Sequence, residues 1–362
     1  MPAICCTDCH APYPENGLPY LCPQCGGVYD FDGPFDFQAA AVDDRQVGIW
    51  RYRHAFSLPP AAPLVSLGEG NTSLIACQHA GRTVWLKQEG LNPSGSYKDR
   101  GSAVLVSSLL TRGASQAVED SSGNAGASFA AYAARAGLQA RVFVPESASG
   151  PKCSQIELYG ADLVRVPGPR SAAAAAVLSE VAQGAVYASH AYLPFGLAGI
   201  ATLAYELWQQ LGRAPGTVIA PVGHGGLLLG IVRGFAALQQ AGAIEQVPYY
   251  VGVQAQACAP VVAEFMGGRP YSEGSTIAEG VRVAKPVRAA ALLREISQRA
   301  GRFVAIEESE ILPAFHWLAR RGIHVEPTSA LAWAAYQQTA DQLVEPVVLI
   351  LSGTGLKYQA LT

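Results

Sequence analysis

The sequence predicts an α/β protein of two or more packed units, with parallel sheets covered by helices. Short apolar segments alternate along the chain with alanine-rich helical patterns, and glycine-rich turns lie where a predicted strand gives way to a predicted helix. Half of the residues are apolar and only 15% are charged, as in a well-buried globular enzyme. This alternation is typical of parallel strands that are buried on both faces. A chain of 362 residues is also long enough for more than one compact unit.

The individual elements follow in order from residue 83. Strands are expected where apolar residues are consecutive, at 83–87, 117–120, 140–145, 163–166, 217–222, 249–254 and Val347–Leu351. Helices are expected at 101–112, 126–136, 227–240, 308–321 and 329–339. In such folds, the loops that follow the carboxyl ends of the strands form the binding site.

Charge and hydropathy exclude several classes of partner. The formal net charge of −3 gives no basic field for nucleic acid. Residues 1–30 contain cysteines, prolines and acidic side chains and do not read as a signal peptide. The longest apolar runs are far shorter than the ~20 residues that a membrane span needs. We therefore expect a cytoplasmic protein with a small-molecule partner, and a homodimer because two-fold assemblies are the commonest.

Four cysteines near the start have the spacing of a metal site. Cys6-x-x-Cys9 and Cys22-x-x-Cys25 form two knuckles separated by twelve residues. Four thiolates can close a tetrahedral zinc shell, which leaves no open position and makes the metal structural. Cys5 could compete as a ligand, and four free thiols in a flexible tail are the alternative.

A lysine stands at the expected start of the helix that follows a proline–glycine turn at 93–95. A helix N-terminus and partial burial lower the pKa of an amine, as Schiff-base chemistry requires. The alternative is that Lys98 and Arg100 are solvated surface charges beside Asp99.

Three more loops follow predicted strands. The loop at 120–126 contains Ser121, Ser122 and Asn124 and suits a carboxylate, while the glycine-rich loop at 221–227 suits a phosphate. Ser352 offers a hydroxyl after the last strand. Each loop alone could be an ordinary turn. Together with Lys98, they indicate an anionic, carbonyl-bearing cofactor such as pyridoxal phosphate (PLP).

The chain resembles the threonine synthase group of fold-type II PLP enzymes over nearly its whole length. The matching motifs are the zinc-ribbon-like start and the segments 68–72, 92–101, 121–128, 223–227, 326–330 and 352–357. The resemblance implies a zinc-ribbon-like segment at 1–42, a large PLP-binding domain at 43–100 and 196–362, and a small α/β domain at 101–195.

The resemblance also implies a role for each site residue. Lys98 would carry the cofactor as a Schiff base and, once released, move the substrate α-proton. Asn124 would contact the 3′-hydroxyl of the cofactor, and Ser352 would face its pyridine nitrogen. The substrate α-carboxylate would lie among Ser121, Ser122 and Ala125. The cofactor phosphate would lie among Gly223, His224, Gly225, Gly226 and Leu227.

One segment departs from the pattern of the group. Threonine synthases convert O-phosphohomoserine and water to threonine and phosphate, and so need a second anion site. Where an Asn-Ser pair and an arginine are expected, this chain has His190, Ala191 and Gly196, and Ala201 follows. The alternatives are therefore a serine or threonine ammonia-lyase, or a β-replacement synthase such as one that makes cysteate. A non-catalytic binding protein is disfavoured because Lys98 is intact.

Overall fold

The computed structural model describes residues 2–148, 150–271 and 273–358. Its contacts divide the chain into two compact units. The first unit contains residues 2–70 and Lys98–Gly199, and the second contains Asn71–Tyr97 and Ile200–Tyr358. The domain boundaries expected at 42/43, 100/101 and 195/196 stay a prediction.

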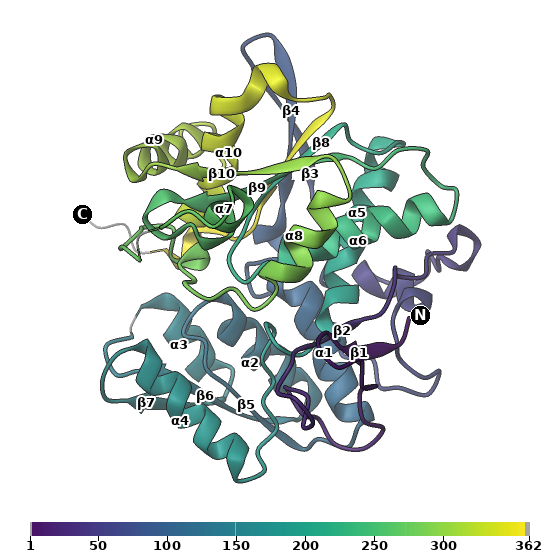
Figure 1. Cartoon of the computed structure of the whole chain (residues 1–362), viewed down its shortest axis with the longest axis vertical. Helices are drawn as coiled ribbons and strands as arrows, with labels where there is room; N and C mark the ends of the chain where they lie inside the picture. The colour runs from purple at the N-terminus through teal and green to yellow at the C-terminus, as the bar shows by residue number, and fades with distance from the viewer. Residues whose placement is uncertain (1, 149, 272, 359–362) are drawn as a thin grey trace. The chain divides into compact units, whose positions relative to one another are not determined.

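The second unit is built on a six-stranded sheet with the order β10-β9-β8-β11-β4-β3 (Figure 1). Its strands are β3 (Leu74–His79), β4 (Arg82–Gln88), β8 (Thr217–Pro221), β9 (Tyr249–Ala255), β10 (Gly301–Ile306) and β11 (Val347–Leu351). All neighbours are parallel except β3 and β4. The last strand of the chain thus lies inside the sheet, between β8 and β4.

Six helices accompany this sheet among the described residues: α5 (Gly196–Leu211), α6 (Gly226–Gln240), α7 (Pro260–Phe265), α8 (Ala289–Ser297), α9 (Glu308–Ala319) and α10 (Pro327–Thr339). Helix α5 begins in the first unit and continues into the second at Ile200. Helix α10 packs on four of the strands, and its fully buried Trp333 stacks on Trp317 of α9 with ring centroids 3.6 Å apart.

The first unit contains a three-stranded parallel sheet with the order β5-β6-β7. The strands are β5 (Gln116–Glu119), β6 (Gln139–Pro145) and β7 (Asp162–Val166), and the helices are α1 (Lys98–Thr111), α2 (Asn124–Ala136), α3 (Pro151–Leu158) and α4 (Arg170–Ala182). Near the N-terminus, β1 (Ile4–Cys6) pairs with β2 (Tyr29–Phe31) in antiparallel orientation.

The predicted α/β class with two parallel-sheet units is confirmed. Helix α1 begins at Lys98, where a helix start was expected after the turn at 93–95, three residues before the helix pattern expected at 101–112. The sequence interpretation missed β3 and β10, which lie at the two edges of the large sheet. Both are only partly buried, so polar residues interrupt the continuous apolar run that marks an interior strand.

Candidate active site

The turn before Lys98 is held by the end of the chain. The N–H of Tyr97, the residue before Lys98, donates to the carbonyl oxygen of Ser352 at 3.0 Å, and the N–H of Thr354 donates to the carbonyl of Gly95 at 3.0 Å. Gly95 has a φ of +90°, and a Cβ there would lie 2.7 Å from the Cγ2 of Thr354. The backbone that leads into Lys98 is therefore fixed by the strand end at β11.

The two residues after Lys98 are not surface charges. Asp99 and Arg100 are both 0% exposed, which contradicts the alternative of a solvated charge cluster. The hydroxyl of Ser128 in α2 donates to Asp99 Oδ1 at 2.6 Å, and that hydroxyl also bonds to Ser102 at 2.7 Å. This buried polar contact joins α1, which carries Lys98, to α2.

The serine–asparagine loop joins β5 to α2. Helix α2 begins at Asn124, and the residue before it, Gly123, has no side chain to cap the first-turn N–H groups. The N–H of Gly123 donates to Ser121 Oγ at 3.2 Å. A Cβ at Gly126 would lie only 1.9 Å from the carbonyl oxygen of Ser121, so this position requires glycine. These loop donors suit a carboxylate, and they belong to the same unit as Lys98.

The glycine-rich loop in the second unit joins β8 to α6. Helix α6 runs for 15 residues from Gly226 to Gln240, and its N-cap residue is again a glycine, Gly225. Gly225 has a φ of +96°, and a Cβ at Gly223 would lie 2.7 Å from the carbonyl oxygen of Gly280. The N–H groups at this helix start and the helix dipole fit a phosphate. His224 Nδ1 accepts from the N–H of Val287 at 3.4 Å.

Ser352 lies directly after β11 and is buried. Its Oγ lies 3.2 Å from the Oγ of Ser329, and it donates to Glu326 Oε1 at 3.5 Å. A neutral hydroxyl is thus available at the end of the interior strand, on the same segment that holds the turn before Lys98.

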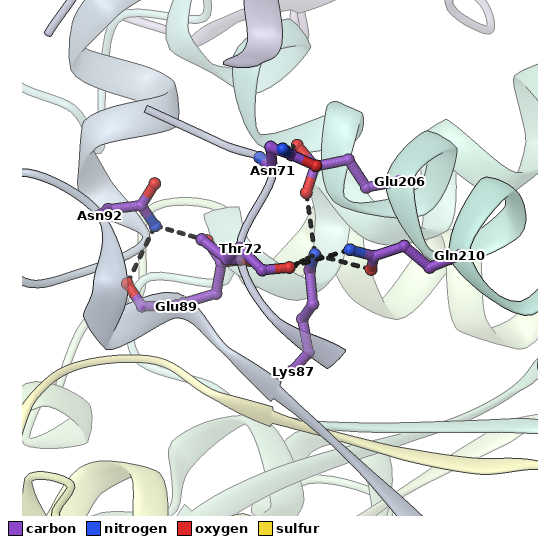
Figure 2. A network of polar contacts seen from close by, with 7 residues as sticks. All are labelled: Asn71, Thr72, Lys87, Glu89, Asn92, Glu206 and Gln210. Carbon is purple, nitrogen blue, oxygen red and sulfur yellow. Dashed lines mark hydrogen bonds and ion pairs between the residues drawn. The ribbon is translucent and has the colours of Figure 1, made fainter. Parts of the chain in front are cut away.

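A buried ion pair, which the sequence interpretation missed, organises the second unit (Figure 2). The ammonium of Lys87 in β4 donates to Glu206 Oε2 at 2.8 Å, to the Thr72 carbonyl at 2.8 Å and to Gln210 Oε1 at 3.0 Å. Lys87 is 0% exposed. The other carboxylate oxygen of Glu206 accepts from the N–H of Asn71 at 2.7 Å. The sequence signal for this ion pair was Lys87, a single lysine within the mostly apolar segment that forms β4.

The network continues toward the turn before Lys98. The Thr72 hydroxyl donates to Glu89 Oε1 at 2.6 Å, and the side-chain amide of Asn92 donates to Glu89 Oε2 at 2.9 Å (Figure 2). Both carboxylate oxygens of buried Glu89 are therefore satisfied. The network joins the Gly-Glu-Gly-Asn-Thr motif at 68–72 to the Asn-Pro-Ser-Gly turn at 92–95.

The four N-terminal cysteines come together. The Sγ atoms of Cys6, Cys9, Cys22 and Cys25 all lie within 4.8 Å of one another. A Cβ at Gly27 would lie 2.7 Å from Cys6 Sγ, so glycine leaves room for this cluster. The arrangement could bind a metal, and four sulfur ligands favour zinc.

The loop of the cysteine cluster is anchored within the first unit. The Arg112 guanidinium donates to the carbonyl oxygens of Pro14, Glu15 and Gly17 at 2.9 to 3.0 Å and lies over the ring of Tyr13. Arg112 follows helix α1, so the loop between the two Cys-x-x-Cys knuckles is tied to the C-terminal end of the helix that begins at Lys98.

The fold and the loops describe an enzyme that holds a phosphorylated carbonyl cofactor. Residues 65–353 match the model of the family described as pyridoxal-phosphate dependent enzyme. The chain belongs to this family. It is 34% identical to a threonine synthase of Methanocaldococcus jannaschii over 97% of this chain and 92% of the relative. It is 35% identical to a threonine synthase of Mycobacterium bovis over 81% of this chain and 83% of the relative.

Solved structures show the same fold. A threonine deaminase from T.th. matches with a TM-score of 0.68 and 27% identity, covering 80% of this chain and 94% of that chain. A fungal L-serine ammonia-lyase from Rhizomucor miehei matches with a TM-score of 0.69 and 23% identity, covering 78% of this chain and 93% of that chain. The predicted resemblance to fold-type II PLP enzymes is confirmed.

The predicted site residues divide between the two units. Lys98, Ser121, Ser122, Asn124 and Ala125 lie in the first unit, and Gly223, His224, Gly225, Gly226, Leu227 and Ser352 lie in the second. Their individual roles stay predictions. Across the described residues, no helix combines the length and the apolar character needed to cross a membrane.

We expect Lys87→Met to destabilise the protein by about 3–5 kcal/mol, because Glu206 then stays buried without its cation. The double variant K87M/E206Q should recover part of this loss, since the glutamine carries no charge and can still accept from the Asn71 N–H. Urea unfolding monitored by tryptophan fluorescence measures the free energy of unfolding of both variants. A K87M variant within about 1 kcal/mol of wild type would contradict a structural role for the pair.

Proposed function

We propose that this chain is a PLP-dependent lyase of the threonine synthase kind, with Lys98 as the residue that carries the cofactor. The main support is that the lysine begins a helix whose adjoining Asp99 and Arg100 are fully buried. The family match over residues 65–353 includes this lysine and the three loops. When bound, the cofactor supplies a carbonyl that takes up the substrate amine and withdraws electrons from its α-carbon.

The residues of the first unit would handle the amino acid. The amine of Lys98 removes and returns the α-proton, because a lysine released from its covalent bond is a base. Ser121, Ser122 and the N–H groups at the start of α2, including that of Ala125, hold the α-carboxylate. Asn124 orients the ring through its 3′-hydroxyl. Support for the carboxylate assignment comes from the glycine at the start of α2, which leaves the first-turn N–H groups without a capping side chain from that position.

The residues of the second unit would hold the cofactor itself. The loop from Gly223 to Leu227 binds the phosphate through its N–H groups at the start of α6. Ser352 would face the pyridine nitrogen with a neutral hydroxyl. Unlike a carboxylate, a hydroxyl does not keep that nitrogen protonated, which makes the ring a weaker electron sink and favours elimination over transamination.

The first candidate reaction is that of the curated relatives, which are named threonine synthases. It converts O-phosphohomoserine and water to threonine and phosphate. A second candidate is the deamination of serine or threonine. It is favoured by the pairing of His190, which stands where the resemblance expects a phosphate ligand, with the carboxyl group of Glu119 at 3.4 Å. A β-replacement synthase is a further alternative, because it would use the same loops.

We also propose a structural zinc ion bound by Cys6, Cys9, Cys22 and Cys25. The mutual Sγ distances within 4.8 Å support it. The metal would stabilise a segment that has little apolar content of its own. We further propose a cytoplasmic homodimer.

Purified protein should show the visible absorption of lysine-bound PLP, and Lys98→Ala should remove it because no amine is left to form the covalent bond. The absorption spectrum measures this directly. Lys285→Ala, which removes an exposed lysine in the second unit, is the matched control and should leave the spectrum unchanged. An unaltered spectrum in K98A would refute the assignment.

Incubation with single substrates should separate the candidate reactions. Joint release of threonine and phosphate from O-phosphohomoserine identifies the first. Ammonia and a 2-oxo acid from serine or threonine, with O-phosphohomoserine inert, identify the second. Assays for phosphate, threonine, ammonia and 2-oxo acid measure the products.

Metal analysis of freshly prepared protein should find about one zinc per chain. Cys22→Ser should lose the metal and lower the melting temperature, because one of four ligands is gone. Cys77→Ser, at a cysteine outside the cluster, is the control. If freshly prepared protein contains no metal, the zinc site is refuted and the four cysteines are free thiols.

A further inference from the structure

The chain between the two Cys-x-x-Cys knuckles carries two aromatic side chains that pack on the rest of the first unit. Tyr13 meets Phe195 edge to face, with ring centroids 5.2 Å apart. Tyr20 meets Tyr187 and Tyr192 in the same way, with both centroid distances 5.3 Å. All three partners belong to the stretch that precedes helix α5. The N-terminal segment is therefore joined to this stretch by ring contacts.

Tyr187 extends this contact to the serine–asparagine loop. Its backbone forms a parallel bridge with Val118 of β5, and its side chain is buried. Its hydroxyl donates to Asp120 Oδ1 at 2.8 Å. Asp120 directly precedes Ser121, so the loop begins at this bond. A contact that fixes the ring of Tyr187 therefore also fixes the start of the loop.

Asp120 also pairs with an arginine, and this contact contributes less. Arg170, the first residue of α4, lies 3.9 Å from Asp120 Oδ2, and its side chain is 57% exposed. An ion pair with so exposed a member contributes little to stability. The Tyr187 hydroxyl bonds a charged acceptor from a buried side chain, and such hydrogen bonds are the stronger ones. Of the two contacts, the one to Tyr187 is the main support of Asp120.

Tyr20 depends in turn on the second cysteine knuckle. Cys22 lies two residues further along the chain, and Leu21 between them forms an antiparallel bridge with Val28. The N–H of Cys22 donates to the carbonyl oxygen of Gly27 at 2.8 Å. The ring of Tyr20 is only partly buried where it packs on the core of the first unit. Its position is therefore set by the backbone that the knuckle holds.

We propose that the N-terminal cysteine segment positions the serine–asparagine loop for substrate binding, through the contact of Tyr20 with Tyr187 and the hydrogen bond of Tyr187 to Asp120. Tyr20 and Tyr187 are then positioning residues for Ser121 and Ser122. The inference rests on the proposed function, because it uses the assignment of this loop to the substrate α-carboxylate. It gives the N-terminal segment a role in substrate affinity.

The consequence for the reaction is specific to one step. A loop without its support must be ordered when the substrate binds, and this ordering costs affinity. Proton transfer by Lys98 takes place after binding, and the glycine-rich loop for the cofactor phosphate lies in the second unit. Loss of the Tyr20 contact should therefore raise KM and leave kcat and cofactor binding almost unchanged.

Hydrogen exchange tests the coupling without substrate or turnover. Tyr20→Ala removes both ring contacts, so the amides at 120–124 should exchange about fivefold faster or more. The N–H of Gly123, which donates to Ser121 Oγ, is one of these amides. Tyr20→Phe keeps the ring and should exchange as wild type does. The amides of β7 at Asp162–Val166 are the internal control and should not change.

Two results of this exchange measurement would overturn the proposal. The first is loop exchange in Y20A that equals that of wild type. The second is faster exchange that extends equally to β7, because the variant would then weaken the whole first unit and would show no specific link to the loop.

Steady-state kinetics test the effect on affinity. The substrate is the one that wild-type protein converts among serine, threonine and O-phosphohomoserine, all of which carry the α-carboxylate. Y20A should raise KM about fivefold or more, keep kcat within about threefold and keep the visible absorption of lysine-bound PLP. Y20F should restore the wild-type KM. Tyr159→Ala, at an aromatic residue that follows α3 in the same unit, is the control and should change neither constant.

A double variant tests whether Tyr20 acts through Tyr187. Tyr187→Phe keeps the ring but removes the hydroxyl that binds Asp120, and it should also raise KM. If both residues act through this one bond, the rise in KM for Y20A/Y187F should be smaller than the product of the two single rises. A rise equal to that product would contradict the shared path.

The metal ligands give an independent test. Cys22→Ser should raise KM in the same direction, because Cys22 lies two residues after Tyr20. A C22S protein that has lost its metal and keeps the wild-type KM would overturn the role of the cysteine segment. Failure of the proposed function differs from this, since wild-type protein would then lack the absorption of lysine-bound PLP or convert none of the three substrates. The exchange measurement would still decide whether Tyr20 holds the loop.

Discussion

The ion pair between Lys87 and Glu206 is the constraint on which the second unit depends. Two charges buried without water are costly unless every donor and acceptor is used. Here the three protons of the ammonium meet three acceptors, and the second carboxylate oxygen of Glu206 accepts a backbone N–H. These bonds tie β4, α5 and the residues Asn71–Thr72 to one another. Because β4 leads directly into the Asn92 turn, this arrangement also sets the path by which the chain reaches Lys98.

Local signals in the sequence predicted the interior strands of the fold correctly. Strands such as β8 and β11 are fully buried and read as continuous apolar runs, and the glycine loops mark the starts of α2 and α6. The edge strands β3 and β10 escaped prediction because solvent on one side admits polar residues. The cluster of four cysteines was predictable from the sequence, because the short spacing within each Cys-x-x-Cys knuckle places two thiols close together.

The candidate site was predictable only where a motif is contiguous. The loop residues around Asn124 and Gly225 lie in short segments whose local chemistry indicates an anion site. The buried charged pairs of the two units are not contiguous in the chain. Glu206 lies 119 residues after Lys87, and His190 lies 71 residues after Glu119. No sequence pattern connects residues so far apart. For the same reason, the sequence left a solvated surface position open as an alternative for Asp99 and Arg100, whereas the structure buries both residues.

The position of β11 has a consequence for how the protein is made. This strand lies between β8 and β4, yet it follows every other described strand in the chain. Until residues Val347–Leu351 emerge, the sheet of the second unit consists of two separate halves with unpaired inner edges. The nascent chain therefore carries two unpaired strand edges from the emergence of β8 until that of β11, and such edges can pair with other chains.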